Sequence, residues 1–396
     1  MSRILVLSNG HGEDLSGSFL SRRLVDNGNI VDALPIVGNG NNYIKQGISI
    51  IGKTKEFKTG GLGYNSFKGR ISDLLNGQII YFIKKLLLAI KIRRKYDYYF
   101  IVGDIVPLFF AWLAQKKSFV YLVAYSSHYE GNLKLPWPCK YFLASKNIKK
   151  IYSRDLFTAN DLRLQLNKEV KFLGNPFMDQ FDIKPNKLRN FSKNIALLPG
   201  SRIPELINNF SLMLELLDNL ASYKYFQDFT FNFALINQFK RQEAIQILNF
   251  RGWQKHGEDF SSKSIKFKYK DININLKWNS FSEILNDSDL VISMAGTATE
   301  QAIGLAKPVV QIIGFGPQFT KAFADAQRRL LGKHIYCVTR YLNKTEQIEE
   351  TIKLIIKSIY LIKIDEKFLI SCEENANARI GKIGATNKII ADIFNY

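Results

Sequence analysis

The segment 8–17 (SNGHGEDLSG) places a histidine and an acid between glycines, directly after an apolar run. Histidine titrates near neutrality, so His11 could take a proton from an attacking hydroxyl, and Glu13 could orient His11 or accept the proton itself. The glycines lack the Gly-x-Gly-x-x-Gly spacing of dinucleotide sites, which argues against NAD. The structural alternative is that Asp14 or Ser16 caps a helix and His11 is merely exposed.

A second segment, 197–206 (LLPGSRIPEL), predicts a strand, a tight turn and a helix that Pro204 enters in its first turn. Arg202 in such a turn is suited to a bidentate contact with a diphosphate. Gly200 and Ser201 would add backbone and hydroxyl donors. The alternative is a helix cap beside a surface arginine.

A third segment, 289–302 (DLVISMAGTATEQA), predicts a strand that turns through small residues into a helix. The free N–H groups at such a helix start can hold phosphates, and Glu300 could accept hydrogen bonds from ribose hydroxyls. The candidate nucleotide-binding residues are Gly296, Thr297, Ala298, Thr299, Glu300 and Gln301. Together with the turn at Gly200, they predict one nucleotide pocket.

Two further polar residues follow apolar runs in the first half of the chain. Asp104 comes after the run 100–103 and is a second candidate for general base or for positioning an acceptor. Capping the next helix is an equally weighted alternative for Asp104. For His128, a satisfied histidine of the core or of a loop is favoured over a catalytic one.

Strand-like apolar runs alternate with helical patterns along nearly the whole chain, which predicts parallel sheets with crossover helices. The expected strands are 4–8, 30–36, 98–102, 119–124 and 149–152, followed after a polar stretch by 195–198, 229–235, 290–293 and 309–313. We therefore expect two Rossmann-like, doubly wound α/β domains facing a cleft, 1–185 and 186–374, and a C-terminal helix within 375–396. Ligands in such sheets bind at the carboxyl ends of the strands, where the three segments lie.

The net charge of +20 calls for a negatively charged partner: nucleic acid, an anionic membrane surface or a phosphorylated substrate. The segment 79–94 predicts an apolar helix with recurring lysines, which fits a membrane-facing helix or a core helix with snorkelling lysines. No nucleic-acid module is recognisable, so a nucleic-acid-binding protein is the less favoured class.

No run of about 20 apolar residues is present, which argues against a membrane-spanning helix. The first expected strand leaves no room for a signal peptide, so a cytoplasmic protein is expected. Three widely spaced cysteines and four histidines suggest neither a disulfide framework nor a metal site. Whether two copies pair as a homodimer is left open.

Four motifs resemble those of the lipid-A-disaccharide synthases and of a group of proteins related to them. The motifs are Pro199-Gly200-Ser201-Arg202 with Glu205, the segment 296–300, Gly174-Asn175-Pro176 with Asp179, and the ending 379–385. The resemblance covers most of the chain and is strongest in the second half. It implies a GT-B fold, a UDP-sugar bound mainly by the C-terminal domain, and an inverting, metal-independent transfer to a membrane-associated lipid or glycolipid.

The same resemblance carries further expectations. It adds Asn175 and Gln318 to the nucleotide-sugar-binding residues, implies no cofactor beside the donor, and implies that the last helix crosses back to the first domain. It places the protein at the cytoplasmic face of the inner membrane, in peripheral contact with anionic lipid.

The first half departs from the synthase pattern, because Gly12-Glu13 is followed by Asp14 and Leu15 without the family's closing acid. A histidine in the glycine-rich first loop is instead similar to the transferase that glycosylates peptidoglycan lipid intermediates, which favours His11 as base. The alternative within enzymes is a UDP-sugar 2-epimerase or hydrolase of the same fold.

Overall fold

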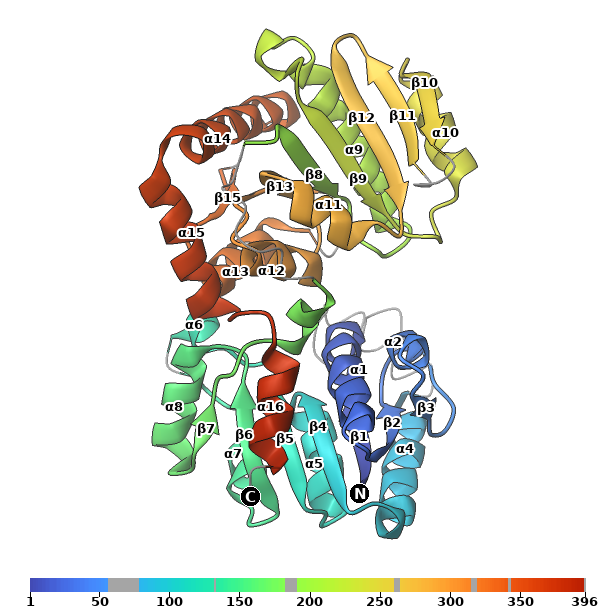
Figure 1. Cartoon of the computed structure of the whole chain (residues 1–396), viewed down its shortest axis with the longest axis vertical. Helices are drawn as coiled ribbons and strands as arrows, with labels where there is room; N and C mark the ends of the chain where they lie inside the picture. Colours follow the sequence, from blue (N-terminus) through green and yellow to red (C-terminus); the bar gives the residue numbers. More distant parts are fainter. Residues whose placement is uncertain are drawn as a thin grey trace. The chain divides into compact units, whose positions relative to one another are not determined.

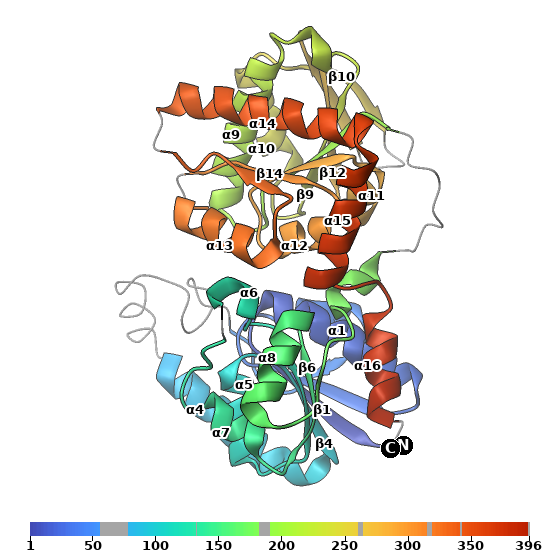
Figure 2. The ribbon, with the colours of Figure 1, turned by 90° about the vertical axis from the view of Figure 1, so that its left-hand side faces the viewer.

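The structure is a computed structural model that describes residues 1–55, 78–131, 133–181, 191–259, 264–314, 319–340 and 343–394. It has two compact units: Met1–Asp179 with Gly381–Tyr396, and Gln180–Ile380. Each unit is built on one sheet with helices on both faces (Figure 1, Figure 2). The expected α/β class with two doubly wound domains is confirmed.

The first unit holds a seven-stranded parallel sheet in the order β3-β2-β1-β4-β5-β6-β7. Its strands are β1 (Arg3–Ser8), β2 (Ile30–Pro35), β3 (Ser49–Ile50), β4 (Tyr98–Gly103), β5 (Ser118–Leu122), β6 (Ile148–Ser153) and β7 (Val170–Lys171). The central strands are buried on both faces, as helices covering a parallel sheet require, and this produces the continuous apolar runs of the sequence.

Helices cover both faces of this sheet. One face carries α1 (His11–Asp26), α2 (Asn41–Lys45) and α16 (Ala385–Phe394); the other carries α4 (Gln78–Ile92), α5 (Ile105–Leu113), α7 (Cys139–Ala144) and α8 (Leu156–Leu166). The short helices are α6 (Ser127–Glu130), η1 (Arg93–Lys95) and η2 (Pro176–Gln180).

The second unit holds an eight-stranded sheet in the order β10-β11-β12-β9-β8-β13-β14-β15. Its strands are β8 (Asn194–Leu198), β9 (Thr230–Leu235), β10 (Gln254–Asp259), β11 (Ser264–Tyr269), β12 (Ile272–Trp278), β13 (Leu290–Ser293), β14 (Val309–Gln311) and β15 (Ile335–Cys337). Its helices are α9 (Glu205–Leu220), η3 (Lys224–Phe226), α10 (Arg241–Phe250), α11 (Phe281–Asp287), α12 (Thr297–Gly304), α13 (Lys321–Leu331), α14 (Lys344–Ile364) and α15 (Glu366–Arg379). The antiparallel strands β10 and β11 extend the sheet beyond β12 and were not expected.

The unit boundaries differ from the expected 185/186 and 374/375. The expected second boundary falls inside α15, which continues to Arg379 because Phe368, Cys372 and Ala376 pack into a small core with Ala306. The chain returns to the first unit only at Gly381, whose φ of +87° suits glycine.

The last helix, α16, belongs to the first unit and packs beside α1. Ile389, Ile390 and Ile393 enter the core between these helices and the sheet. The Asp179 carboxylate accepts hydrogen bonds from the backbone N–H groups that begin α16, at 2.6 Å from Gly384, 3.2 Å from Ala385 and 2.7 Å from Thr386. A carboxylate at a helix N-terminus is favoured by the helix dipole, so Asp179 fixes where the returning chain docks.

Candidate active site

Three neighbouring strands of the second unit bring the turns after β8, β13 and β14 together. The Met294 N–H donates to the Leu198 carbonyl at 2.8 Å, which joins the first two turns. Gly200 has a φ of +101°, and a Cβ there would lie 3.2 Å from the Met294 carbonyl oxygen. Glycine is therefore required at position 200 both by conformation and by the close approach of the neighbouring turn.

Asn209 on α9 is a buried polar residue that supports these turns and that sequence reasoning missed. Its Nδ2 donates to the Pro199 carbonyl at 2.9 Å. A Cβ on Gly314, after β14, would lie 3.2 Å from Asn209 Oδ1. The available signal was an asparagine within the apolar stripe of α9, because a buried amide has to find partners.

The helix α12 begins at Thr297, and Gly296 stands before it as the exposed N-cap. The N–H groups of Thr297 and Ala298 lie in the first turn, ahead of the intrahelical hydrogen bonds, and can serve an anion. Glu300 is half-buried one turn into the helix. The turn that the sequence analysis selected is therefore a helix start in the structure, and its role in binding a phosphate stays a prediction.

Two of the expected nucleotide contacts are placed differently by the structure. Thr299 is fully buried, and its hydroxyl bonds Ser293 Oγ at 2.7 Å and the Ala295 carbonyl at 2.6 Å. Gln301 is also buried, at 2% exposure. Both side chains are therefore buried in the described structure, and a contact of either residue with a nucleotide stays a prediction.

Two buried glutamine side chains support the turn that precedes α12. Gln327 on α13 donates from Nε2 to the Gly296 carbonyl at 3.3 Å, and Gln311 on β14 donates to Gln327 Oε1 at 2.5 Å. These glutamines were not predicted, since neither lies in a glycine-rich segment.

Arg202 and Ser201 are exposed in the turn between β8 and α9, where a ligand can reach them. The Arg202 carbonyl accepts the N–H of Leu206 at 2.7 Å, which fixes the turn that carries the guanidinium. Burial raises the pKa of the Glu205 carboxyl, and the Arg202 charge opposes this rise. Gln318, the remaining expected contact of this unit, lies outside the described residues.

In the first unit, the turns after β1 and β4 bring Glu13 and Asp104 to one edge of the sheet. His11 is the first residue of α1, and only its backbone is described. Glu13 lies in the first turn of α1, and a Cβ on Gly10 would lie 2.5 Å from Glu13 Oε2. A Cβ on Gly103 would lie 3.3 Å from Glu13 Cγ. The glycines of both turns therefore leave room for the Glu13 side chain.

The Asp104 carboxylate is engaged on both oxygens. Oδ1 accepts the Val106 N–H at 2.9 Å and caps α5, and Oδ2 accepts from Asn9 Nδ2 at 2.9 Å. Burial raises the pKa of Asp104, although both hydrogen bonds favour its charged form. The capping alternative is thus realised for Asp104, and the assignment of the base to His11 or Asp104 stays a prediction.

A buried aspartate and a buried lysine lie beneath the turn after β1. Neither was predicted as a site residue. Asp14 accepts from Ser8 Oγ at 2.6 Å, and Tyr43 donates to Ser8 Oγ at 2.9 Å. Burial raises the pKa of Asp14 to about 7, opposed by the Ser8 hydrogen bond and the Lys85 charge. Burial lowers the pKa of Lys85 to about 8, opposed by Asp14. Lys85 Nζ also donates to the Pro35 carbonyl at 2.8 Å, so α4 is tied to the end of β2.

Asn175 was expected to contact the nucleotide, but the structure gives it a structural role. It is fully buried in the first unit, where Oδ1 accepts from the Tyr121 hydroxyl and Nδ2 donates to the Arg154 carbonyl at 2.8 Å. These contacts join the carboxyl ends of β5 and β6, so the side chain is committed to the fold.

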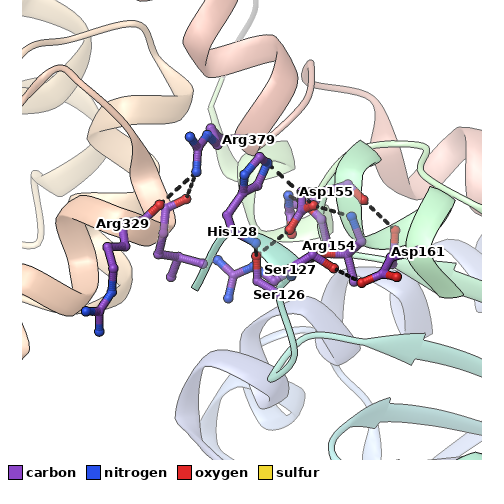
Figure 3. A network of polar contacts seen from close by, with 12 residues as sticks. Ser126, Ser127, His128, Arg154, Asp155, Asp161, Arg329 and Arg379 are labelled. Atoms are coloured by element: carbon purple, nitrogen blue, oxygen red, sulfur yellow. Dashed lines mark hydrogen bonds and ion pairs between the residues drawn. The ribbon is translucent and has the colours of Figure 1, made fainter. Parts of the chain in front are cut away.

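His128 lies in a polar network after β5 and β6 (Figure 3). Asp155 caps α8 through the Thr158 N–H at 2.7 Å, accepts from Ser126 Oγ at 2.7 Å, and lies 3.7 Å from His128 Nε2. Ser127 Oγ donates to Asp161 at 2.9 Å. Asp155 and Ser126 thus cap helices, and His128 lies within the short helix α6 with its ring beside the Asp155 carboxylate. The structural role that the sequence favoured for His128 stays a prediction.

The chain resembles a known protein in sequence over part of its length. A stretch of 174 residues is 26% identical to lipid-A-disaccharide synthase 2 of Legionella pneumophila, covering 42% of this chain and 40% of the relative. The chain thus matches less than half the length of that relative. No protein-family model matches.

Solved structures resemble the whole chain. MurG of Acinetobacter baumannii matches over 100% of both chains with a TM-score of 0.58 at 13% identity. A UDP-GlcNAc 2-epimerase of Neisseria meningitidis, bound to UDP-GlcNAc, covers 98% of both chains with a TM-score of 0.54 at 16% identity. The MnaA–UDP structure of S. aureus covers 99% of this chain and 96% of its own, with a TM-score of 0.56 at 13% identity. The chain therefore has the GT-B fold, as the sequence predicted.

Proposed function

We propose that this protein is an inverting glycosyltransferase that moves a hexose or N-acetylhexosamine from a UDP-sugar to a lipid or glycolipid acceptor. The observation that carries the proposal is the difference between the two sheet edges. The edge of the second unit offers first-turn N–H groups of α12 and the Arg202 guanidinium, all of which favour anions. The edge of the first unit also has a helix start, at His11, but the carboxyl groups beside it are those of Glu13 and Asp104, and no described arginine lies in these turns.

In the proposed reaction the acceptor hydroxyl attacks the anomeric carbon of the donor sugar and displaces UDP. His11 takes the hydroxyl proton as the acceptor oxygen forms the new bond. The bond from the anomeric carbon to the diphosphate breaks, and Arg202 together with the N–H groups at the start of α12 stabilises the departing charge. The reaction needs no metal ion if Arg202 and these N–H groups stabilise the negative charge of the departing diphosphate.

The proposed acceptor lies at a membrane, because one face of the first unit is apolar, aromatic and basic. On α4, Ile79, Ile80, Ile83 and Leu87 are half or more exposed, and Lys84 and Lys91 lie among them. The neighbouring α5 and α7 extend this face to Tyr141 and, just before α7, to Trp137, which is 92% exposed. Exposed aliphatic, aromatic and cationic side chains on one face favour an anionic bilayer surface. We name this set the α4 face and propose that it holds the protein on the cytoplasmic side of the inner membrane.

No helix in the described part of the chain is long and apolar enough to cross a bilayer.

Replacing both Ile83 and Leu87 by glutamate is expected to lower binding to vesicles that contain an anionic phospholipid by 10-fold or more, because two apolar contacts worth about 1.5–3 kcal/mol each are lost. Vesicle co-sedimentation measures this. The matched control is Ile44→Glu on α2, which is as exposed as Leu87 but lies on the other face of the sheet. Equal binding by the double variant and the wild type would contradict the α4 face.

A second candidate is a UDP-sugar 2-epimerase or hydrolase, which the fold supports equally because 2-epimerases are among its structural neighbours. An assay of the purified protein with UDP-N-acetylglucosamine separates the two. A transferase is expected to release UDP only when lipid acceptors are added. Release of UDP, or a new sugar epimer, from the donor alone would instead establish the second candidate.

Binding of the donor is tested first by thermal unfolding with UDP, ADP, GDP and TDP. A ligand at about 100 times its Kd stabilises the folded state by about 2.7 kcal/mol, so UDP is expected to raise Tm selectively. An absence of any shift with uridine nucleotides would refute both candidates.

A further inference from the structure

The strands β6 and β7 form one edge of the sheet in the first unit (Figure 1). A cavity of about 240 Å³, which we name the β6–β7 pocket, lies beside them. β7 pairs with β6 only at Ile151 and Tyr152, and no described strand covers residues 148–150 on that side. Four of the residues that line the pocket are lysines: Lys149, Lys150, Lys168 and Lys171. The pocket therefore collects positive charge at an open edge of the sheet.

A β-bulge in β6 brings two consecutive lysines to this pocket. β6 pairs with β5 in regular register except at Lys149, which is an extra residue between two paired positions. Successive side chains of a regular strand point to opposite faces, and a bulge redirects a side chain. Lys149 and Lys150 both line the pocket as a result.

Two of the four lysines are already engaged by acids. Asp392 on α16 accepts a hydrogen bond from Lys171 Nζ at 2.6 Å, lies 3.4 Å from Lys150 Nζ, and accepts from the Tyr152 hydroxyl at 2.8 Å. Glu169 lies 3.3 Å from Lys171 Nζ, but its side chain is 65% exposed, so water weakens this ion pair. Both acids thus serve Lys150 and Lys171.

The other two lysines have no described acid as a partner. Lys168 Nζ donates to the carbonyls of Leu143 at 3.1 Å and Ser145 at 2.7 Å, which uses two of its three N–H groups. Lys149 is exposed, and no described residue forms a hydrogen bond or ion pair with its side chain. Burial lowers the pKa of Lys168, and the nearby Lys149 charge lowers it further. An anion bound by both ammonium groups would relieve this repulsion.

We propose that the β6–β7 pocket is a binding site for a phosphomonoester group, held by Lys149 and Lys168. Such a group carries about 1.5–2 negative charges at pH 7 and three acceptor oxygens, which suits two ammonium groups with unused N–H donors. The group can belong to a soluble metabolite or to a lipid head group, since both present the same chemistry. The pocket extends along the amino-terminal half of β6, whereas the turns of the candidate active site follow carboxyl ends of strands. This site is therefore additional to the proposed donor and acceptor sites.

Titration calorimetry of the untagged, full-length protein with glycerol 3-phosphate at low ionic strength measures this binding. Lys149→Glu is expected to weaken it by about 10-fold or more, because a positive charge beside the ligand becomes negative. Lys149→Arg keeps the charge and should bind as the wild type does. The matched control is Lys45→Glu, the same change of charge on an exposed residue of α2, which packs at the opposite edge of the sheet.

A variant that should act in the opposite direction excludes a purely structural effect. Glu169→Gln removes a negative charge from the pocket and is expected to tighten binding by about 2- to 5-fold, as an exposed charge allows. Equal affinities in the wild type and Lys149→Glu, or weaker binding in Glu169→Gln, would overturn the inference. So would a loss of binding in Arg202→Ala without a loss in Lys149→Glu, because the ligand would then occupy the proposed donor site.

Vesicles distinguish the two sources of the phosphate. Phosphatidylcholine vesicles are prepared with phosphatidic acid, which presents a phosphomonoester, or with phosphatidylglycerol, which presents a phosphodiester. A lipid ligand predicts that Lys149→Glu loses co-sedimentation with the first vesicles and keeps it with the second. A soluble ligand predicts that Lys149→Glu changes only the calorimetric affinity. If Lys149→Glu changed neither the calorimetric affinity nor the co-sedimentation, the pocket would not be a phosphate site.

Discussion

Replacing Gly296 by leucine is expected to lower the affinity for UDP by about 100-fold or more, or about 2.8 kcal/mol. A Cβ built on Gly296 meets no described heavy atom within 4 Å, so the space around it does not require glycine. Its φ of −81° and ψ of −94° lie outside the regions that other residues favour, so the variant is also expected to lose about 1–3 kcal/mol of stability to backbone strain. The open space lies directly in front of the N–H groups that would hold the donor diphosphate, so a side chain would displace the ligand.

Titration calorimetry measures the affinity of the variant for UDP, and thermal unfolding of the free protein measures its stability. Gly257→Leu, in β10 of the same unit, is the matched control, because a Cβ there makes only ordinary contacts with Lys266. Gly314→Leu is expected to lower Tm, since its Cβ would lie 3.2 Å from the buried Asn209 Oδ1 as well as 2.6 Å from Met294 Cε. Unchanged UDP affinity in Gly296→Leu would move the donor site away from α12.

Removing the Asp179 carboxylate is the second large effect that we expect. Asp179→Ala should destabilise the docking of α16 by about 2–4 kcal/mol, because three backbone N–H groups lose a charged acceptor. Hydrogen exchange at Gly384, Ala385 and Thr386 should accelerate by about 30-fold or more, which corresponds to the lower end of that range.

Asp365→Ala provides the comparison for this prediction. Asp365 caps its own helix, α15, through a single N–H contact with Phe368 at 3.0 Å. An ordinary cap of this kind is worth about 1 kcal/mol. If Asp179→Ala cost no more than Asp365→Ala, the anchoring of α16 would rest on its apolar face alone.

Much of the fold was predictable because the central strands are buried on both faces. Runs such as 4–8 and 98–102 have to be apolar throughout, and this pattern stands out in a sequence. In β12, by contrast, buried isoleucines alternate with asparagines, and β10 has no fully buried residue. The alternation in β12 is the pattern of a half-buried strand, which a search for continuous apolar runs misses. For β10 the sequence offers no such pattern, so pairing with β11 determines its structure.

The residues of the candidate site also fall into those that the sequence predicted and those that it did not. The turns at Gly200 and Gly296 were found because glycine and small residues between a strand and a helix mark a close approach. Asn209, Gln327 and Lys85 were missed because each acts from a neighbouring element, and only the tertiary fold brings them to the site. The burial of Thr299 was likewise invisible, since a threonine in a small-residue turn can face either way.

The return of the chain at Gly381 has a consequence for synthesis on the ribosome. The first unit is discontinuous, and the whole second unit is translated before Ile389, Ile390 and Ile393 become available to its core. At about 5–20 residues per second, the second unit takes on the order of ten to forty seconds to emerge. Throughout that interval the helix α1 and the sheet beneath it expose the apolar surface that α16 will cover. The first unit to be made is therefore the last to be completed, and nascent chains are expected to need protection on that surface.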